Sequence, residues 1–166
     1  MSQKSIFLDR DGVIVDNGVH YYIWKKEQLT FVEGVFENLK LLISRGFKLF
    51  IVSNQGGIAR GIYTKSEMDD FHRELIHIFQ DHQIEIADVL FCPHHPEIEK
   101  CLCRKPSGLM IERLIAKYGL DKSDCLLIGD SESDMEAAEQ AGIKATKIPS
   151  NHNMLPYIDD LLNERW

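Results

Sequence analysis

Two aspartates separated by a single residue, Asp9 and Asp11, end the first apolar run of the sequence, and Gly12 follows them. Because side chains alternate along extended backbone, both carboxylates can point toward one spot beyond the end of a strand. The glycine permits a sharp turn there. Neighbouring carboxylates repel each other unless a cation or a shared proton lies between them. The spacing therefore indicates a Mg²⁺ site with a carboxylate nucleophile, and an Asp-rich turn is the alternative.

Polar side chains also follow two later apolar runs, and a lysine precedes a helical segment. They are Ser53 and Asn54 after 47–52, Asp130 and Asp134 after 125–128, and Lys105 before 107–118. The carboxyl ends of parallel strands meet at one edge of a sheet, where such sheets hold their ligands. A turn explains one acidic strand end well, but a common site better explains three polar strand ends and a lysine.

Short apolar runs alternate with helical segments along the sequence. The expected strands are 6–8, 47–52, 89–92, 125–128 and 144–148, and the expected helices are 34–45, 64–81, 107–118, 135–141 and 155–162. This alternation predicts an α/β fold with a doubly wound, mainly parallel, Rossmann-like sheet and helices on both faces. We expect a single domain over 1–166, without a large cap domain, because no insertion is long enough. His72, His77 and His82 are expected on or near the solvated faces of helix 64–81.

The composition is that of an acidic globular protein: 44% of the residues are hydrophobic, 27% are charged, and the formal net charge is −7. Nonspecific nucleic-acid binding needs a basic face, so we expect no nucleic-acid partner. No run approaches the ~18 apolar residues of a membrane span, and Met1 to Lys4 leads straight into a strand. We therefore expect a cytoplasmic monomer without a membrane partner, acting on a small soluble molecule.

A phosphate monoester bound at the carboxyl edge could be hydrolysed by these carboxylates. Asp9, nearest the strand end, is the natural nucleophile and would form an acyl phosphate that water later removes. Asp11 could protonate the leaving alcohol and then activate the water. Mg²⁺ held by Asp9, a backbone oxygen near Asp11, and Asp130 would bring the anionic nucleophile and the phosphate together.

The remaining polar groups at this edge suit the phosphoryl oxygens. The Ser53 hydroxyl and the Asn54 backbone N–H could hold these oxygens. Lys105 would neutralise charge on the transferring group, where catalysis depends mostly on positioning and electrostatics. Asp134 would orient Lys105 or a metal-bound water.

A cluster of soft metal ligands interrupts the α/β pattern between 92 and 103. Its candidates are Cys92, Cys101 and Cys103 with one imidazole, either His94 or His95, between which the spacing does not choose. Three thiolates and an imidazole make a closed tetrahedral Zn²⁺ site, which is structural rather than catalytic. The zinc would stiffen the loop that leads into Arg104 and Lys105 and so position these cations. Reduced, unligated cysteines are the alternative, and Cys125, inside an apolar strand, is expected in the core.

These motifs resemble the four signature motifs of the haloacid dehalogenase superfamily, in the family's order and over nearly the whole chain. The motifs are Asp9-x-Asp11-Gly12, Ser53, Lys105, and Gly129-Asp130 with Asp134. More narrowly, the sequence is similar to two branches, the heptose-bisphosphate phosphatases and the histidinol-phosphate phosphatases. The markers are Asp9-Arg10-Asp11-Gly12, the segment 54–61, Cys92-Pro93-His94-His95-Pro96 and the segment 101–106. The resemblance implies a Mg²⁺-requiring phosphatase, the roles given above, and His94 as the zinc ligand.

The resemblance also implies a set of substrate contacts. They are Asn17, Gly18, Val19, His20, Ser53, Asn54, Gln55, Gly56, Arg104 and Lys105. Arg104 could pair with a second phosphate through its guanidinium, and a surface cation beside the zinc loop is the alternative. The form of 54–61 favours a sugar phosphate of the heptose 1,7-bisphosphate type. The six-residue spacer between the zinc-ligand pairs is more like the histidinol-phosphate branch.

Two other classes of function fit the sequence less well. A noncatalytic phosphate-binding module would not need both Asp9 and Asp11. A zinc-dependent nucleic-acid binder would need a basic face with interleaved aromatic residues, and this acidic chain lacks one. The sequence therefore favours a phosphatase.

Overall fold

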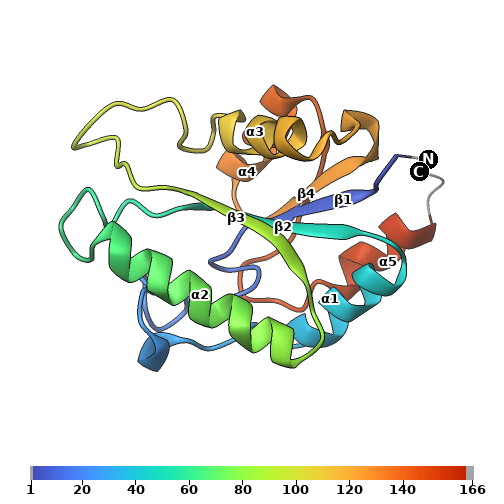
Figure 1. Cartoon of the computed structure of the whole chain (residues 1–166), viewed down its shortest axis with the longest axis horizontal. Helices are drawn as coiled ribbons and strands as arrows, with labels where there is room; N and C mark the ends of the chain where they lie inside the picture. Colours follow the sequence, from blue (N-terminus) through green and yellow to red (C-terminus); the bar gives the residue numbers. More distant parts are fainter. Residues whose placement is uncertain (1, 164–166) are drawn as a thin grey trace.

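The structure, a computed structural model, describes residues 2–163 and is built on one five-stranded sheet (Figure 1). The strands are β1 (Ser5–Leu8), β2 (Lys48–Asn54), β3 (Ile86–Cys92), β4 (Cys125–Gly129) and β5 (Lys144–Lys147). They lie in the order β3-β2-β1-β4-β5, and every pairing is parallel. β1 is therefore central, with Leu8 opposite Ile51 of β2 and Ile128 of β4. The predicted doubly wound parallel sheet is confirmed.

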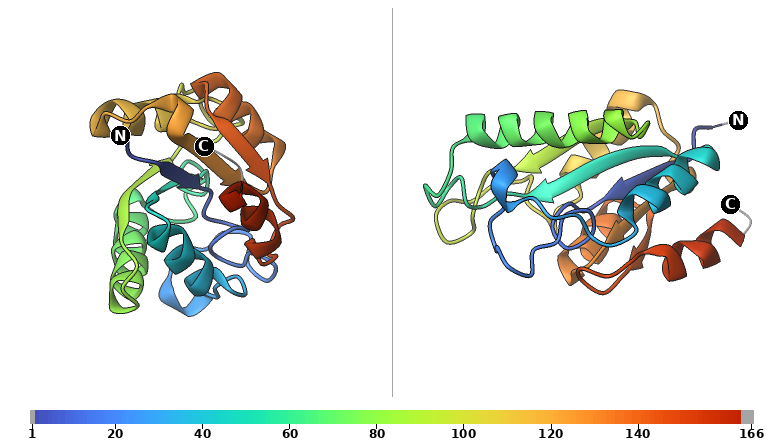
Figure 2. Two further views of the ribbon diagram at one scale, coloured as in Figure 1. Left: turned by 90° about the vertical axis from the view of Figure 1, so that its right-hand side faces the viewer. Right: turned by 90° about the horizontal axis from the view of Figure 1, so that it is seen from below.

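Helices cover both faces of the sheet. They are α1 (Val35–Ser44), α2 (Lys65–Asp81), α3 (Leu109–Tyr118), α4 (Glu132–Ala141) and α5 (Leu155–Asn163), with short 3₁₀ helices at Lys26–Gln28 and Lys122–Asp124. Figures 1 and 2 show α3 and α4 on one face and α1, α2 and α5 on the other. The alternation of β1 explains the two layers, because Ile6 and Leu8 join the core under α1 and α2 while Phe7 joins the core under α3 and α4.

Capping residues decide where the helices that flank the site begin. Thr64 forms a capping box with Glu67 and starts α2, as the sequence predicts. Ser131 forms a second capping box with Asp134, so α4 begins at Glu132, three residues before the expected start. This earlier start brings Asp134 into the first turn of the helix, directly after β4.

One prediction about α2 is wrong. His72 is 6% exposed and packs inside the protein, whereas His77 and His82 are exposed as expected. The helix presents Met68, Phe71 and His72 together toward the core, since residues three and four apart share a helix face. Across the described residues, no helix is long and apolar enough to cross a membrane.

Candidate active site

Lys105 meets two aspartates at the carboxyl edge of the sheet. Its Nζ lies 2.8 Å from Asp9 Oδ1 and 2.5 Å from Asp134 Oδ1, and it donates to the Val52 carbonyl at 3.0 Å. The side chain of Lys105 is only 3% exposed. Asp9 directly follows β1, and Asp134 lies just beyond the neighbouring strand β4. The parallel topology thus brings together groups that lie far apart in the sequence.

Asp134 joins this ion pair to the start of α4. Its Oδ2 accepts from the backbone N–H groups of Asp130 and Ser131, each at 3.2 Å, and from the Ser131 hydroxyl at 2.8 Å. Its Oδ1 accepts from Lys105. The carboxylate is fully buried, so these donors fix its orientation. The same side chain therefore caps the helix and holds the lysine.

Three carboxylates in this cluster suit a divalent cation. Asp9, Asp130 and Asp134 each offer an oxygen, and these atoms lie within 4.8 Å of one another. Burial raises the pKa of Asp9 well above its usual range, Lys105 opposes the rise, and the two neighbouring carboxylates add to it. Burial acts to lower the pKa of Lys105, but its two anionic partners outweigh burial and raise it, so the lysine is charged. Three carboxyl groups share a single ammonium, so a divalent cation would relieve their mutual repulsion. Oxygen donors are those that Mg²⁺ prefers, so the residues fit this ion.

Gly12 belongs both to a turn and to the acidic cluster. Its φ of +86° is in the left-handed region that favours glycine. A Cβ at this position would lie 2.1 Å from Asp130 Oδ2. The glycine therefore allows the turn after β1 and also the close approach of Asp130. The Asp-rich turn and the carboxylate cluster, given as alternatives from the sequence, are parts of one structure.

The carboxylate of Asp11 is held apart from that cluster. It accepts from Arg10 Nε at 2.8 Å, from Arg10 Nη2 at 3.0 Å and from Gln55 Nε2 at 3.1 Å. Arg10 is fully buried, and the sequence analysis gave it no role. Its position two residues beyond a buried strand was the available signal, because a buried charge must be paired.

A cavity of about 200 Å³ opens beside these groups. It is lined by Asp9, Asp11, Asn17, Tyr21, Tyr22, Asn54, Gln55, Gly56, His95, Arg104, Lys105, Asp130, Ser131 and Ser133. From the sequence, His95 was a candidate only for the zinc site, as the alternative to His94, and its place in the cavity wall was not predicted. Gly56 is tightly enclosed, because a Cβ there would lie 2.9 Å from His95 Cδ2 and 3.1 Å from Arg104 Nη1.

Several predicted substrate contacts lie outside this lining. Gly18, Val19 and His20 are exposed, Val19 by 88%, and among the described residues they do not line the cavity. Ser53 is 1% exposed, and its hydroxyl accepts from Gln55 Nε2 at 2.7 Å. The roles given to these four residues remain predictions.

The side chain of Asn54 ties the end of β2 to the backbone of Lys105. Its Nδ2 donates to the Lys105 carbonyl at 3.0 Å, and its Oδ1 accepts from the Lys105 N–H at 2.9 Å. The neighbouring Arg104 donates from Nη1 to the His94 carbonyl at 3.0 Å. These contacts hold the two cations of the segment in place and couple Arg104 to the cysteine loop.

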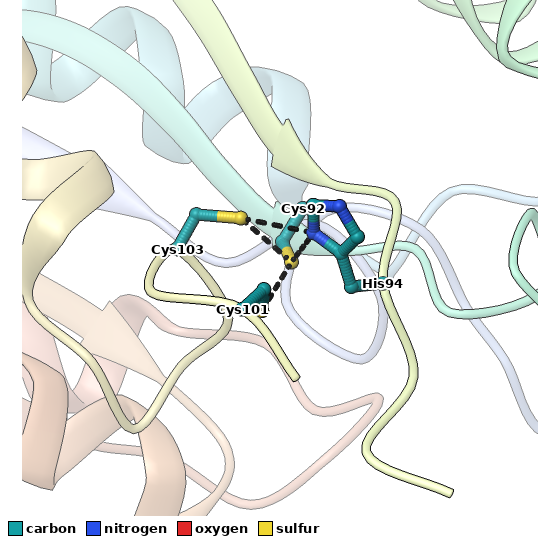
Figure 3. A group of neighbouring side chains, drawn as sticks. All are labelled: Cys92, His94, Cys101 and Cys103. Atoms are coloured by element: carbon teal, nitrogen blue, oxygen red, sulfur yellow. Dashed lines mark hydrogen bonds between the residues drawn. The ribbon is translucent and has the colours of Figure 1, made fainter. Parts of the chain in front are cut away.

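The cysteine loop gathers the ligand atoms of Cys92, His94, Cys101 and Cys103 (Figure 3). Cys92 Sγ lies 3.4 Å from His94 Nδ1, 3.6 Å from Cys101 Sγ and 3.0 Å from Cys103 Sγ, and His94 Nδ1 lies 3.3 Å from Cys103 Sγ. A tetrahedral zinc with Zn–S bonds of about 2.3 Å has ligand–ligand distances of roughly 3.3–3.8 Å. Three of these four distances fall in this range and the Cys92–Cys103 distance is shorter. The donor types and their close grouping fit Zn²⁺. All four cysteines are free thiols, and Cys125 is buried in the core as expected.

The structure separates the two adjacent histidines. His94 is directed into the sulfur cluster, while His95 lines the cavity and lies 3.2 Å from Arg60 through its Nε2. The direction of His94 agrees with the zinc-ligand role that the family resemblance implies, and that role stays a prediction.

The parallel sheet and the acidic cluster at its carboxyl edge define a hydrolase fold of a known class. The model of the haloacid dehalogenase-like hydrolase family matches residues 4–142, and the chain belongs to this family.

Relatives of the chain include bacterial heptose-bisphosphate phosphatases. D-glycero-beta-D-manno-heptose-1,7-bisphosphate 7-phosphatase from Haemophilus ducreyi is 35% identical over 89% of this chain and 83% of its own. D-glycero-alpha-D-manno-heptose-1,7-bisphosphate 7-phosphatase from Campylobacter jejuni is 38% identical over 86% of this chain and 80% of its own. The histidine biosynthesis bifunctional protein HisB of Campylobacter jejuni is 36% identical over 89% of this chain, which spans 42% of that protein.

A solved structure shares the fold. The D,D-heptose 1,7-bisphosphate phosphatase from B. bronchiseptica, complexed with magnesium and phosphate, superposes with a TM-score of 0.78 at 27% identity. The match covers 86% of this chain and 78% of that one.

Proposed function

We propose that the protein is a Mg²⁺-dependent phosphatase that removes the 7-phosphate of D-glycero-D-manno-heptose 1,7-bisphosphate through an aspartyl-phosphate intermediate. The observation that carries the proposal is the buried lysine bridge between Asp9 and Asp134 beside Asp130. Relatives named for this reaction, at 35% and 38% identity over most of the chain, support the substrate. We further propose that residues 1–166 act as one catalytic domain, as a monomer in the cytoplasm.

Asp9 is the proposed nucleophile. One carboxylate oxygen attacks phosphorus, the bond from phosphorus to the leaving alcohol breaks, and Asp11 supplies the proton that this alcohol needs. Water then attacks the acyl phosphate, Asp11 takes its proton, and the free Asp9 carboxylate and inorganic phosphate result. A Mg²⁺ ion held by Asp9, Asp130 and a backbone oxygen near Asp11 would neutralise charge between nucleophile and phosphate.

The groups around the transferring phosphoryl would be neutral donors and one cation. Lys105 would neutralise negative charge on the transferring phosphoryl group, since its Nζ lies at the Asp9 carboxylate. The Asn54 backbone N–H is the proposed donor to one phosphoryl oxygen, and the Ser53 hydroxyl is the proposed donor to another. Asp134 keeps the lysine in place from its other side.

Arg104 is the proposed partner of the second phosphate of the substrate. It lines the cavity together with His95 and Asn17. Its guanidinium is anchored by one nitrogen to the His94 carbonyl, which leaves other donors of the fork for an anion. A heptose carrying phosphates at both ends would thus be held by charge at two points.

Zinc is the proposed structural ion of the loop 92–103. The ligand atoms of Cys92, His94, Cys101 and Cys103 lie within 4.8 Å of one another, which supports this assignment. Such a closed site leaves no position for substrate, so its role is to hold the loop. This loop continues directly into Arg104 and Lys105.

Histidinol phosphate is the second candidate substrate. The HisB relative and the short spacer between the zinc-ligand pairs favour it. Histidinol phosphate has a single phosphate and a cationic imidazole or amine at the other end. The cation Arg104 at the cavity wall favours the bisphosphate instead.

A direct comparison of the two substrates tests the proposal. Phosphate release from heptose 1,7-bisphosphate and from histidinol phosphate is measured with Mg²⁺, for the wild type and for Arg104→Met. We expect kcat/KM to be at least about 100-fold higher for the bisphosphate, and Arg104→Met to reduce that preference by about tenfold or more. A preference for histidinol phosphate that Arg104→Met leaves unchanged would reject the assigned substrate.

A further inference from the structure

The guanidinium of Arg10 is held in a single orientation inside the protein. It is fully buried, and the ring of Phe71 lies 5.0 Å from its central carbon. A guanidinium carries five N–H donors, and five acceptors surround this one. They are both oxygens of Asp11, the Ile23 carbonyl at 2.7 Å, Met68 Sδ at 3.1 Å and His72 Nε2 at 3.1 Å. No donor is left to point elsewhere, so the fork cannot rotate without losing a contact.

His72 must be neutral to take part in this arrangement. Arg10 has only donors, so the Nε2 of His72 has to be an acceptor, which places the ring proton on Nδ1. Burial first, and the guanidinium second, lower the pKa of His72 well below its usual range. The histidine is therefore suited to be a permanent acceptor for Arg10.

The Asp11 carboxylate accepts hydrogen bonds from the other side of the Arg10 guanidinium. Two parallel N–H groups of Arg10 contact its two oxygens, and Gln55 Nε2 adds a third donor. Gln55 is itself fixed, because Tyr63 OH donates to its Oε1 at 2.7 Å. The Asp11 side chain is 21% exposed, and it lines the cavity.

We propose that Arg10 is a positioning residue that fixes the Asp11 carboxylate for proton transfer, and that His72 fixes Arg10 in turn. This inference rests on the proposed function, in which Asp11 gives a proton to the leaving alcohol and later takes one from water. Neither Arg10 nor His72 touches the cavity-facing edge of Asp9. Of the residues that Arg10 contacts through its side chain, Asp11 is the one that lines the cavity, so we expect the effect to pass through Asp11.

The two chemical steps respond differently to a displaced Asp11. With p-nitrophenyl phosphate, the leaving nitrophenolate needs no proton, so attack by Asp9 proceeds without Asp11 while hydrolysis of the acyl phosphate still needs it. With a sugar phosphate, both steps need Asp11. A misplaced Asp11 thus produces a rapid burst of nitrophenolate, about one per active site, followed by slow turnover.

The experiment measures this burst by stopped flow with Mg²⁺ for the wild type, Arg10→Met and Arg10→Lys. We expect a burst rate within about threefold of wild type but a steady-state rate about 10- to 100-fold lower, which is part of what general acid–base catalysis contributes. Turnover of heptose 1,7-bisphosphate should fall by a similar factor. Arg10→Lys should not restore the rate, since an ammonium cannot form the two-point contact.

The pair His72→Phe and His72→Gln keeps the test decisive if Arg10 variants fail to fold. Phenylalanine fills the space without an acceptor, so we expect turnover about three- to tenfold lower, whereas the glutamine amide oxygen restores it to within about twofold. Burst and steady-state rates that fall in the same proportion, or wild-type rates in both Arg10→Met and His72→Phe, would overturn the inference.

Asp9→Asn separates this inference from the proposed function. If that variant still forms nitrophenolate at the wild-type rate, the aspartyl-phosphate mechanism itself is wrong. If Asp9→Asn is inactive while the Arg10 and His72 variants behave as wild type, only the positioning role is wrong.

Discussion

Two groups of side chains could each hold a metal ion, but the chain builds them in different ways. They are the oxygen cluster of Asp9, Asp130 and Asp134 and the sulfur cluster of Cys92, His94, Cys101 and Cys103. Asp9, Asp130 and Asp134 come from opposite ends of the sequence and meet because β1 and β4 are neighbours in the sheet. The sulfur cluster comes from one loop, 92–103. Sheet topology makes the first cluster, whereas local spacing makes the second. We therefore expect substitutions in the first cluster to change mainly the phosphatase activity, and substitutions in the second to change mainly the zinc content.

The largest expected effect is at the oxygen cluster. Asp9→Asn removes the attacking carboxylate, so phosphate release from the preferred substrate should fall by at least about 1,000-fold. Zinc content, measured by atomic emission, should stay the same because no zinc ligand changes. Asp159→Asn, at an exposed position of α5, is the matched control and should be as active as wild type. Substantial activity in Asp9→Asn would mean that another group attacks phosphorus.

Asp134→Asn should have the next largest effect. It leaves Lys105 with a single anionic partner, so we expect kcat to fall by about 100-fold and the helix cap to weaken by about 1 kcal/mol. Thr64→Ala is the control, because it weakens the corresponding capping box of α2 without removing a contact to Lys105. Chemical denaturation and steady-state kinetics are compared for both. Equal losses of activity in the two variants would show that helix stability, rather than the lysine contact, matters.

The sulfur cluster should respond more weakly in activity. Cys101→Ser should bring zinc from about one ion per chain toward zero and lower kcat/KM by roughly tenfold, because Arg104 and Lys105 lose a rigid support. Cys125→Ala is the matched control, since this fourth cysteine lies in the core, and it should keep its zinc. Full activity in a zinc-free Cys101→Ser protein would contradict the supporting role.

The smallest expected effect concerns the buried network behind Asp11. His72 is neutral in the folded protein, whereas the unfolded chain takes up a proton near pH 6.5, so the free energy of unfolding falls as the pH drops below about 6.5. The contribution of His72 to the free energy of unfolding changes by up to about 1.4 kcal/mol per pH unit. Urea unfolding at pH 7.5, 6.5 and 5.5 should show a shallower slope for His72→Gln than for wild type. His77→Gln, at an exposed position, should keep the wild-type slope.

The sequence predicted the parts of the site that depend on strand ends. Period and composition located the five strands, and parallel strands must bring their carboxyl ends to one edge. Asp9, Asp130 and Lys105 could therefore be grouped without coordinates. The cysteine ligands could be grouped because they are close in sequence.

What the sequence missed depends on side-chain direction within an element. A histidine in an amphipathic helix was expected near water, yet His72 sits on the core face, where its polarity is satisfied by Arg10. Neither residue by itself signals burial in the sequence, because each is stable inside the protein only through its contact with the other. The burial of the Ser53 hydroxyl against Gln55 is of the same kind. Such pairings are set by packing rather than by spacing.

Two consecutive residues, His94 and His95, divide their side chains between the sulfur cluster and the cavity wall. The peptide bond between these two residues thus joins the sulfur cluster directly to the wall of the cavity. Oxidation of a thiol in this loop would remove a ligand of the proposed zinc and so loosen the backbone that carries His95 and receives Arg104. A change in the sulfur cluster would then alter the binding of substrate at the cavity wall without any contact between a sulfur atom and the substrate.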